Sequence, residues 1–414
     1  MPIVSPEVSK IESCRICGSA DLNFILDLGI QPLSGVFPEQ GESDPPSGPL
    51  IILKCEKCDL VQLAHDYPKE WLYGENYGYR SGLNSSMAKH LISKAKNLEH
   101  YANLATEDFV LDIGSNDGTL LNAYSKGLHR VGIDPTLGKF SEFYDDGIHK
   151  IENFFNSTTY LEDFKKAKLI TSISMFYDLQ NPRKFVADVR DCLRKDGFWH
   201  FEQSYLYSML TANSYDTICH EHLEYYSMKA IKYLLELEGM KIIDVELNRI
   251  NGGSFAITAT HSDNPISASP LVGWLLEKEE MSAQIETNPL SNFSKSVPRH
   301  RDSLQNLLGR LHDDGKVIWG LGASTKGNVL LNYCGFDEKT IAKICDVNDY
   351  KFTRMTPGSH IPICPESELL ETMPDFAMVL PWHFRDNIIS RQTEYMSRGG
   401  KLIFPLPDIE VLSS

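Results

Sequence analysis

The chain has 414 residues, 42% of them hydrophobic and 23% charged, which is typical of a globular protein with two or three domains. Its net charge of −16 argues against a nucleic-acid partner, because DNA and RNA binding usually depends on a basic face. No stretch approaches the roughly 18 apolar residues of a membrane helix, and the N-terminus has no secretory signal pattern. We therefore expect a cytoplasmic protein, whose charge still permits a small anionic ligand such as a nucleotide sugar.

Residues 1–75 are expected to be loop-rich, with many prolines and short apolar runs, so core burial alone should not hold this segment together. Two C-x-x-C pairs, Cys14 with Cys17 and Cys55 with Cys58, offer four thiolates. In a cytoplasmic protein this spacing indicates metal rather than disulfides, and two such pairs can close a tetrahedral shell around Zn²⁺. The pattern predicts a structural zinc-binding domain over residues 1–75; the alternatives are four unrelated thiols or a redox pair.

Residues 76–262 alternate buried-type strands with amphipathic stretches, which predicts a doubly wound α/β domain. Two further strands around Gly252-Gly253 predict a hairpin. The expected strands are Phe109–Ser115, His129–Asp134, His149–Phe155, Leu169–Met175, Gly197–Gln203, Met240–Leu247 and Ser254–Thr260.

A glycine-rich turn follows the first of these strands. Gly114 and Gly118 allow close approach of a ligand to the backbone, and the helix that follows favours an anion at its N-terminus. Asp134 ends the next strand, where an acid holds a ribose diol in such folds. The D-x-G-x-x-x-G pattern lacks a dinucleotide fingerprint and instead resembles the S-adenosylmethionine turn of class I methyltransferases. A turn with no ligand is the alternative.

Further cofactor-binding positions are expected on the same edge of the sheet. Three belong to the turn and two follow the fourth strand, where a core role is equally open for Met175. These residues are Asp112, Asn116, Asp117, Met175 and Tyr177.

The segment after the fifth strand is dense in proton-transfer groups. It contains His220, Glu221 and His222 among three tyrosines, and in a doubly wound sheet such a loop lies at the ligand edge. The histidines are two positions apart rather than the four of the zinc-protease helix, which disfavours a metal site. General acid–base catalysis is the preferred interpretation, with a solvated polar loop as the alternative.

Residues 263–414 begin with a polar, helix-leaning stretch from 270 to 314 and continue into a second α/β unit. Its glycine turn presents backbone N–H groups, hydroxyls and a lysine at a helix N-terminus, which predicts a diphosphate site, with a helix cap as the alternative. The expected contacts are Ser324, Lys326, Gly327 and Asn328, with Trp382 and His383 nearby at the end of a later strand. The unit's expected elements are strands Lys316–Leu321, Ile341–Asp346, Phe376–Trp382 and Lys401–Pro405 and helix Lys326–Cys334.

Together these motifs resemble the sugar C-methyltransferases that act on thymidine-diphosphate (dTDP)-linked 4-keto-6-deoxy sugars. The resemblance runs almost end to end. It is carried by the two C-x-x-C pairs, Tyr77–Asn84, Leu111–Gly118, His220–Ser227 and Gly322–Asn328.

The resemblance implies three domains: a zinc-binding domain (1–75), an S-adenosylmethionine-binding methyltransferase domain (76–262) and a Rossmann-like C-terminal domain that binds the nucleotide sugar (263–414). It further implies His222 as base, Glu221 as a contact to the sugar and Tyr79 at the site, with His220 beside them. The reaction would pass through an enolate, with C3 favoured over C5 as the methylated carbon. We expect a monomer or a weak homo-oligomer.

Two rival functions share parts of this pattern. An O- or N-methyltransferase of a sugar or other small metabolite would need the same cofactor turn and only a base. A non-catalytic zinc-dependent binding or scaffold protein would need neither, and the intact Gly114, Gly118 and Asp134 argue against it.

Overall fold

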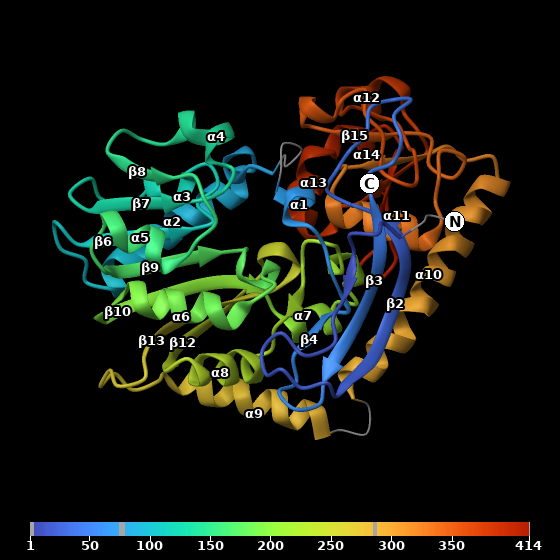
Figure 1. Cartoon of the computed structure of the whole chain (residues 1–414). Helices are drawn as coiled ribbons and strands as arrows, with labels where there is room; N and C mark the ends of the chain where they lie inside the picture. The colour runs from blue at the N-terminus through green and yellow to red at the C-terminus, as the bar shows by residue number, and fades with distance from the viewer. Residues whose placement is uncertain (1–3, 74–78, 285–287, 414) are drawn as a thin grey trace.

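The structure is a computed structural model that describes residues 4–73, 79–284 and 288–413. Three principal β-sheets form its framework: a central one of seven strands, a C-terminal one of six and an N-terminal one of four. Figure 1 shows the central and C-terminal sheets on opposite sides of the molecule, with the N-terminal strands beside both. No helix of the described ranges is long and apolar enough to cross a membrane.

The central sheet has the order β12-β13-β10-β9-β6-β7-β8, in which only β13 runs antiparallel to its neighbours. Because β6 pairs in parallel with both β7 and β9, the strand order reverses there, and the carboxyl ends of these strands form a ligand-binding edge. This is the predicted class I methyltransferase sheet. Its strands are β6 (Phe109–Ile113), β7 (His129–Ile133), β8 (Ile148–Ile151), β9 (Ala167–Ile173), β10 (Leu193–Ser204), β12 (Met240–Asn248) and β13 (Ser254–His261).

Helices cover the central sheet, and the predicted hairpin around Gly252-Gly253 joins β12 to β13 through the short turn η5 (Ile250–Gly252). The expected strand His149–Phe155 ends earlier, at Ile151, because the residues after it leave the sheet and line a pocket. The helices are α2 (Ser85–Tyr101), α3 (Thr119–Asn122), α4 (Leu137–Phe140), α5 (Ser157–Asp163), α6 (Pro182–Cys192), α7 (Leu206–Thr211) and α8 (Met228–Leu237). Short 3₁₀ turns are η1 (Ser81–Leu83), η2 (Ser141–Phe143), η3 (Phe176–Asp178) and η4 (Tyr215–Thr217).

The N-terminal segment contains more regular structure than its proline content predicts. A long hairpin of β2 (Leu22–Pro32) and β3 (Ser47–Cys55) dominates it, because the prolines fall mainly at strand ends, where a missing N–H costs little. The expectation of a mainly loop-rich segment was therefore wrong. The remaining elements are β1 (Ser9–Lys10), β4 (Val61–Leu63), β5 (His65–Asp66) and α1 (Lys69–Tyr73).

The fourth strand of the N-terminal sheet comes from the central part of the chain. This is β11 (Glu224–Tyr225), which directly follows the histidine-rich segment and pairs antiparallel with β4. The sequence analysis did not anticipate this strand.

The C-terminal unit follows two long helices, α9 (Pro270–Gln284) and α10 (Pro289–Asp313), in the stretch expected to be helical. Its sheet has the order β16-β15-β14-β17-β18-β19, parallel except for the last pair. The strands are β14 (Ile318–Leu321), β15 (Ile344–Asp346), β16 (Ile363–Pro365), β17 (Phe376–Val379), β18 (Lys401–Phe404) and β19 (Glu410–Leu412). The helices and turns are α11 (Thr325–Cys334), α12 (Ser367–Thr372), α13 (Arg385–Arg391), α14 (Thr393–Ser397), η6 (Asp349–Lys351) and η7 (Trp382–Phe384).

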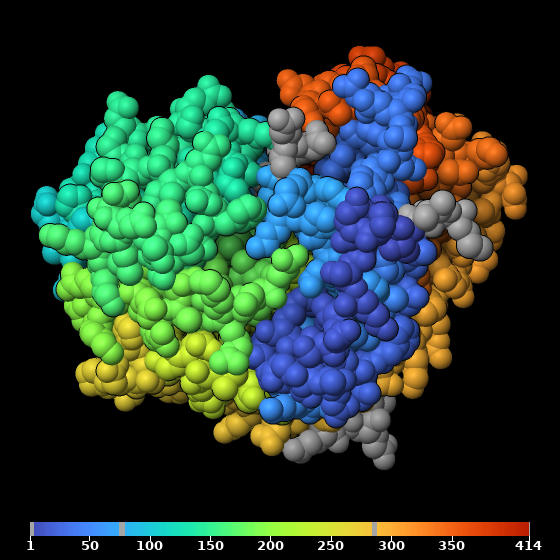
Figure 2. Space-filling view, in the orientation of Figure 1, coloured from blue at the N-terminus to red at the C-terminus, as the bar shows by residue number. Residues whose placement is uncertain are grey.

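The N-terminal segment shares its apolar core with both larger parts. Leu26 and Leu28 of β2 belong to one cluster with Val297 of α10 and Val329 of α11, whereas the four cysteines belong to the core of the central sheet. Figure 2 shows N-terminal residues spread across the boundary between the two α/β parts. The division at residues 75 and 262 stays a prediction.

Candidate functional site: a zinc cluster, a cofactor pocket and a polar cluster

The four predicted cysteines converge. Their sulfur atoms lie within 4.8 Å of one another, with Cys14 Sγ 3.4 Å from Cys58 Sγ and Cys17 Sγ 3.4 Å from Cys55 Sγ. Four Zn–S bonds of about 2.3 Å in a tetrahedron separate sulfurs by about 3.8 Å, so the cluster fits a zinc ion. Cys14, Cys55 and Cys58 are buried, which suits a structural site with no open position.

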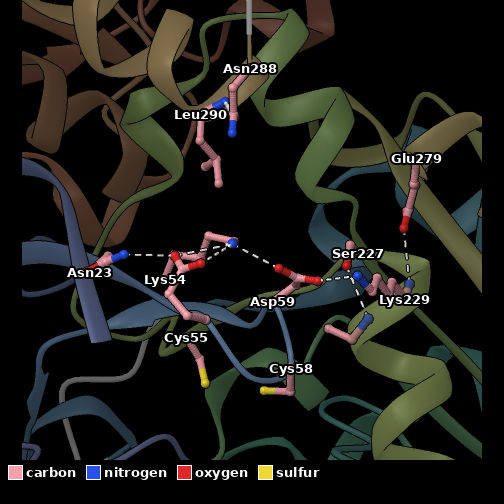
Figure 3. A network of polar contacts seen from close by, with 12 residues as sticks. Asn23, Lys54, Cys55, Cys58, Asp59, Ser227, Lys229, Glu279, Asn288 and Leu290 are labelled. Atoms are coloured by element: carbon pink, nitrogen blue, oxygen red, sulfur yellow. Dashed lines mark hydrogen bonds and ion pairs between the residues drawn. The ribbon is translucent and has the colours of Figure 1, made fainter. Parts of the chain in front are cut away.

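The two knuckles have the same backbone turn. The N–H of Gly18 donates to the carbonyl of Cys14, and the N–H of Asp59 donates to that of Cys55 (2.9 Å each). Gly18 and Asp59 both adopt positive φ, at 68° and 59°, so the backbone of each knuckle turns back just after its second cysteine. In Figure 3 the side chains of Cys55 and Cys58 extend from this turn, below the ion pairs of Asp59.

A pocket opens at the switch point of the central sheet, where the cofactor was predicted. Gly114 lies at its floor with φ of 73°, and a Cβ there would meet Met175 Cγ at 2.8 Å. Most of the predicted cofactor residues line it, whereas Gly118 and Tyr177 do not. Those that do are Asp112, Gly114, Asn116, Asp117, Asp134 and Met175.

Hydrogen bonds hold the first glycine turn in shape. The Asn116 N–H donates to Asp134 Oδ2 (2.9 Å), and the Thr136 N–H donates to Asp134 Oδ1 (2.7 Å). Two ionised oxygens can accept more than these bonds, so Asp134 retains acceptor capacity for ribose hydroxyls. Gly118 has a packing role instead, because a Cβ there would meet the Tyr144 ring at 2.8 Å.

The same turn holds the segment that carries Tyr79. The Gly82 N–H donates to Asp117 Oδ2 (2.8 Å), and the Asn116 amide donates to the Tyr79 carbonyl (3.1 Å). Tyr79 lines the cofactor pocket and is 50% exposed.

The sequence analysis missed most of the other lining residues, Phe154, Phe155 and Tyr73 among them. Phe154 and Phe155 follow β8 at the ligand edge, and an aromatic pair directly after the third strand was the available signal. Tyr73 of α1 and Asp178 of η3 share a hydrogen bond at the wall of the pocket. Burial raises the pKa of the Asp178 carboxyl well above its usual range, and the neighbouring Glu221 and Glu224 add to this rise. The wall of the cofactor pocket thus adjoins the histidine-rich segment.

His222 lies against the cofactor-binding sheet, with its ring 4.4 Å from that of Tyr177 in an edge-to-face contact. His222 Nδ1 is 2.9 Å from the carbonyl oxygen of Thr217, which can only accept, so Nδ1 carries the proton. Burial, together with the positive charge of Lys326, lowers the pKa of His222 to about 3. The ring is therefore neutral at pH 7, with Nε2 as its free basic nitrogen.

The other two members of the histidine-rich segment face the N-terminal part. His220 is fully buried, packs edge-to-face on Tyr67 at 4.9 Å and lies 3.4 Å from the Gly48 carbonyl, an environment typical of a core side chain. Glu221 abuts Gly35, where an added Cβ would meet Glu221 Oε1 at 2.5 Å and Thr325 Oγ1 at 3.7 Å. Burial raises the pKa of Glu221.

Most residues of the second glycine turn make contacts inside the protein rather than facing a ligand. Ser324 caps α11 by accepting the Gly327 N–H (3.0 Å), and Gly327 packs so closely that a Cβ would meet Leu380 Cβ at 2.8 Å. Asn328 is fully buried and donates to the Ser34 carbonyl (2.8 Å). Of the predicted substrate-binding set, Ser324, Lys326 and His383 are partly accessible.

Lys326 faces the seam between the central and C-terminal parts. Its Nζ donates to the Asn251 carbonyl (2.9 Å), and its positive charge lowers the pKa values of His222 and His383. Trp382 donates from Nε1 to Asp216 Oδ2 (2.8 Å). Lys326, His222 and His383 thus form a polar cluster, which brings the predicted base close to the predicted substrate-binding lysine.

Family models match the chain in three consecutive segments. These are a zinc binding domain (residues 14–73), a methyltransferase domain (86–245) and a C-methyltransferase C-terminal domain (249–407). A curated relative, C-methyltransferase NovU of Streptomyces niveus, is 29% identical over 415 aligned residues, covering 98% of each chain. This chain is an S-adenosylmethionine-dependent C-methyltransferase.

Solved structures overlap with the enzyme only loosely. An S-adenosylmethionine-dependent methyltransferase from Clostridium acetobutylicum is 13% identical, with a TM-score of 0.34 over 42% of this chain and 92% of its own. The plantazolicin methyltransferase BamL is 15% identical, with a TM-score of 0.36 over 43% of this chain and 87% of its own. Overlaps this partial carry no argument about substrate.

Replacing Cys55 with Ser should remove the bound zinc, because a hydroxyl is a poor replacement for one of four thiolate ligands. Elemental analysis of the purified protein should fall from one zinc per chain to a small fraction of that value, with a lower melting temperature. Cys192→Ser is the control, since Cys192 is buried away from the cluster and should leave the zinc content intact. Full zinc in Cys55→Ser would contradict this assignment.

Replacing Gly114 with Val should abolish measurable cofactor binding, because the side chain would displace Met175 and strain a backbone at positive φ. Overpacking and backbone strain each cost about 1–3 kcal/mol, so affinity should fall roughly 10- to 100-fold or more. Gly147→Val is the matched control, with φ of 82° and open space around its Cβ. Calorimetry that finds equal affinity for S-adenosylmethionine in both variants would refute the role of Gly114.

Proposed function

We propose that the enzyme methylates a ring carbon of a dTDP-linked 4-keto-6-deoxy sugar, with C3 favoured, and that His222 is the base. The sequence motifs support the sugar class, and the neutral imidazole of His222 supports the chemistry. S-adenosylmethionine, when bound, provides the methyl group from a sulfonium centre that departs as a neutral thioether. What the protein must add is a base, a partner for the developing oxyanion and a fixed geometry.

The observation that carries the proposal is the tautomer of His222. Its Nδ1–H is committed to the Thr217 carbonyl, so Nε2 has a free lone pair and can take a proton from the carbon beside the ketone. The electron pair of that C–H bond moves into the enolate, and the carbon then forms its new bond to the methyl group. The edge-to-face contact with Tyr177 orients the ring.

The enolate needs a positive or hydrogen-bonding partner at its oxygen. Tyr79 is the candidate from the cofactor side, since its main chain is fixed by the first glycine turn. Lys326 is the candidate from the C-terminal side, because its charge acts directly on His222. Glu221 is proposed to orient the sugar.

The nucleotide end is proposed to lie along the C-terminal unit. The N-terminus of α11, with Ser324 and Lys326, favours an anion there, and the partly exposed His383 follows β17 at the same edge. Lys326 therefore has two possible tasks, at the diphosphate or at the enolate oxygen, and these have different kinetic consequences.

Replacing His222 with Asn should reduce kcat about 100- to 10,000-fold while both ligands still bind, since a positioned base contributes on this scale. The same variant should stop exchange of deuterium from solvent into the sugar carbon in the absence of S-adenosylmethionine, measured by mass spectrometry. The substrate for both assays is a dTDP-linked 4-keto-6-deoxy sugar.

His220→Asn is the comparison for that experiment, because His220 lies in the core beside Tyr67. It should lower stability more than turnover. Normal turnover in His222→Asn together with lost turnover in His220→Asn would show that His222 is not the base. Turnover without solvent exchange would favour O- or N-methylation.

Replacing Lys326 with Met distinguishes its two possible tasks. A diphosphate contact predicts a raised KM for the sugar nucleotide with kcat nearly unchanged, whereas an oxyanion partner predicts a kcat loss of roughly 100-fold or more. In both cases the KM for S-adenosylmethionine should stay nearly constant. Equal loss of both affinities would mean that the lysine serves folding alone.

A further inference from the structure

We infer that Arg15, inside the first zinc knuckle, is a positioning residue for the loop that carries His222. The inference rests on the proposed role of His222, but its structural part can be tested separately. Arg15 lies between Cys14 and Cys17, and its side chain is only 3% exposed. It therefore points inward from the metal cluster rather than toward solvent.

The Arg15 guanidinium holds the strand that follows the second knuckle. It donates to the carbonyls of Leu63 (2.7 Å) and His65 (3.1 Å) and to the carboxylate of Asp66 (2.6 Å). The Arg15 N–H also donates to the buried side chain of Gln62 (3.1 Å). These bonds fix β4 and β5 relative to the cysteine cluster.

The strand held by Arg15 in turn holds the loop that carries His222, which we call the catalytic loop. The Leu63 N–H donates to the Leu223 carbonyl (2.8 Å), one residue beyond His222, and the Leu223 N–H donates to the Tyr177 carbonyl (2.8 Å). The next two residues pair with β4 as β11. The main chain beside His222 is thus clamped between the knuckle-bound strand and the cofactor-binding sheet.

A direct contact reinforces this link. Arg15 Nε lies 3.7 Å from Glu224 Oε1, and the Glu224 side chain is fully buried. Neither Arg15 Nε nor either carboxylate oxygen of Glu224 has a hydrogen-bond partner among the described residues. Removing one member of such a buried pair leaves the other without compensation, which is far costlier than losing an exposed pair.

The second knuckle offers a contrast. Asp59 forms ion pairs with Lys54 (2.8 Å) and Lys229 (2.5 Å), and the main chain of Lys229 donates to Glu279 (3.0 Å), as Figure 3 shows. Lys229 is 67% exposed, so this connection should contribute little. Arg15 therefore adds a buried link from the first knuckle to β4, the strand that follows the second knuckle directly in the chain.

The test compares Arg15→Gln with Lys57→Gln, an exposed basic residue inside the second knuckle. In the zinc-loaded full-length enzyme, Arg15→Gln should keep one zinc per chain and nearly unchanged KM values. Its kcat should fall about 100-fold, because a displacement of about 1 Å at a catalytic group costs on this scale. Hydrogen exchange should accelerate at the amides of Leu63 and Leu223. Lys57→Gln should change none of these quantities.

Two further variants test the proposed connection. Arg15→Lys keeps the charge and should retain part of the kcat that Arg15→Gln loses. If Arg15→Gln does not fold, Arg15→Lys is measured in its place. In Glu224→Gln combined with Arg15→Gln, the effects on kcat should be non-additive, because the two side chains are in contact.

Unchanged kcat or unchanged amide exchange in Arg15→Gln, with zinc retained, would overturn the inference. Parallel loss of zinc, kcat and cofactor affinity would overturn it too, since Arg15 would then only stabilise the metal site. If His222→Asn keeps normal turnover, the proposed base is wrong, yet faster exchange at Leu223 in Arg15→Gln would still support the link between knuckle and loop.

Discussion

The main chain at Leu223 connects two parts of the molecule that are far apart in sequence. Its N–H bonds to Tyr177, which follows a strand of the cofactor-binding sheet, and its carbonyl accepts the N–H of Leu63 in the N-terminal sheet. A buried backbone group must find a partner, so neither bond can be given up without cost. Since His222 immediately precedes Leu223, the position of the proposed base depends on how the N-terminal segment packs against the central sheet.

The zinc cluster is best understood in this context. The N-terminal strands share a core with the C-terminal unit, whereas the cysteines share a core with the central sheet. A segment divided between two cores in this way needs a fixed point, and four thiolates around one metal ion provide a rigid one. Four thiolates leave the metal no open coordination position, so its contribution is geometric.

Burial favours the uncharged forms of two side chains near the proposed reaction site. Burial lowers the pKa of His222 and raises that of Asp178, so both groups favour the neutral state at pH 7. The neutral imidazole keeps a lone pair for a proton, but the lowered pKa makes it a weaker base. The positive charge of Lys326 makes a protonated imidazole less stable and an anionic substrate oxygen more stable.

The sequence by itself determined the features that depend on local pattern. The C-x-x-C pairs, the strand–turn–helix around Gly114 and the alternation of strands and helices each follow from residues close together in the chain. It also supplied six residues that line the pocket of the central sheet, because the carboxyl ends of parallel strands meet at one edge of the sheet. The long hairpin β2–β3 was missed because its prolines resemble loop signals when their place at strand ends is unknown.

Only the tertiary structure decided which side chains share a space. It separated His220 from His222, burying the first beside Tyr67 and placing the second near the charge of Lys326, although both lie in one short motif. It also turned Asn328 toward Ser34 rather than toward a ligand, and it paired Arg15 with Glu224. Such contacts join residues hundreds of positions apart, and they depend on how sheets pack against one another. Local periodicity contains no information about that packing.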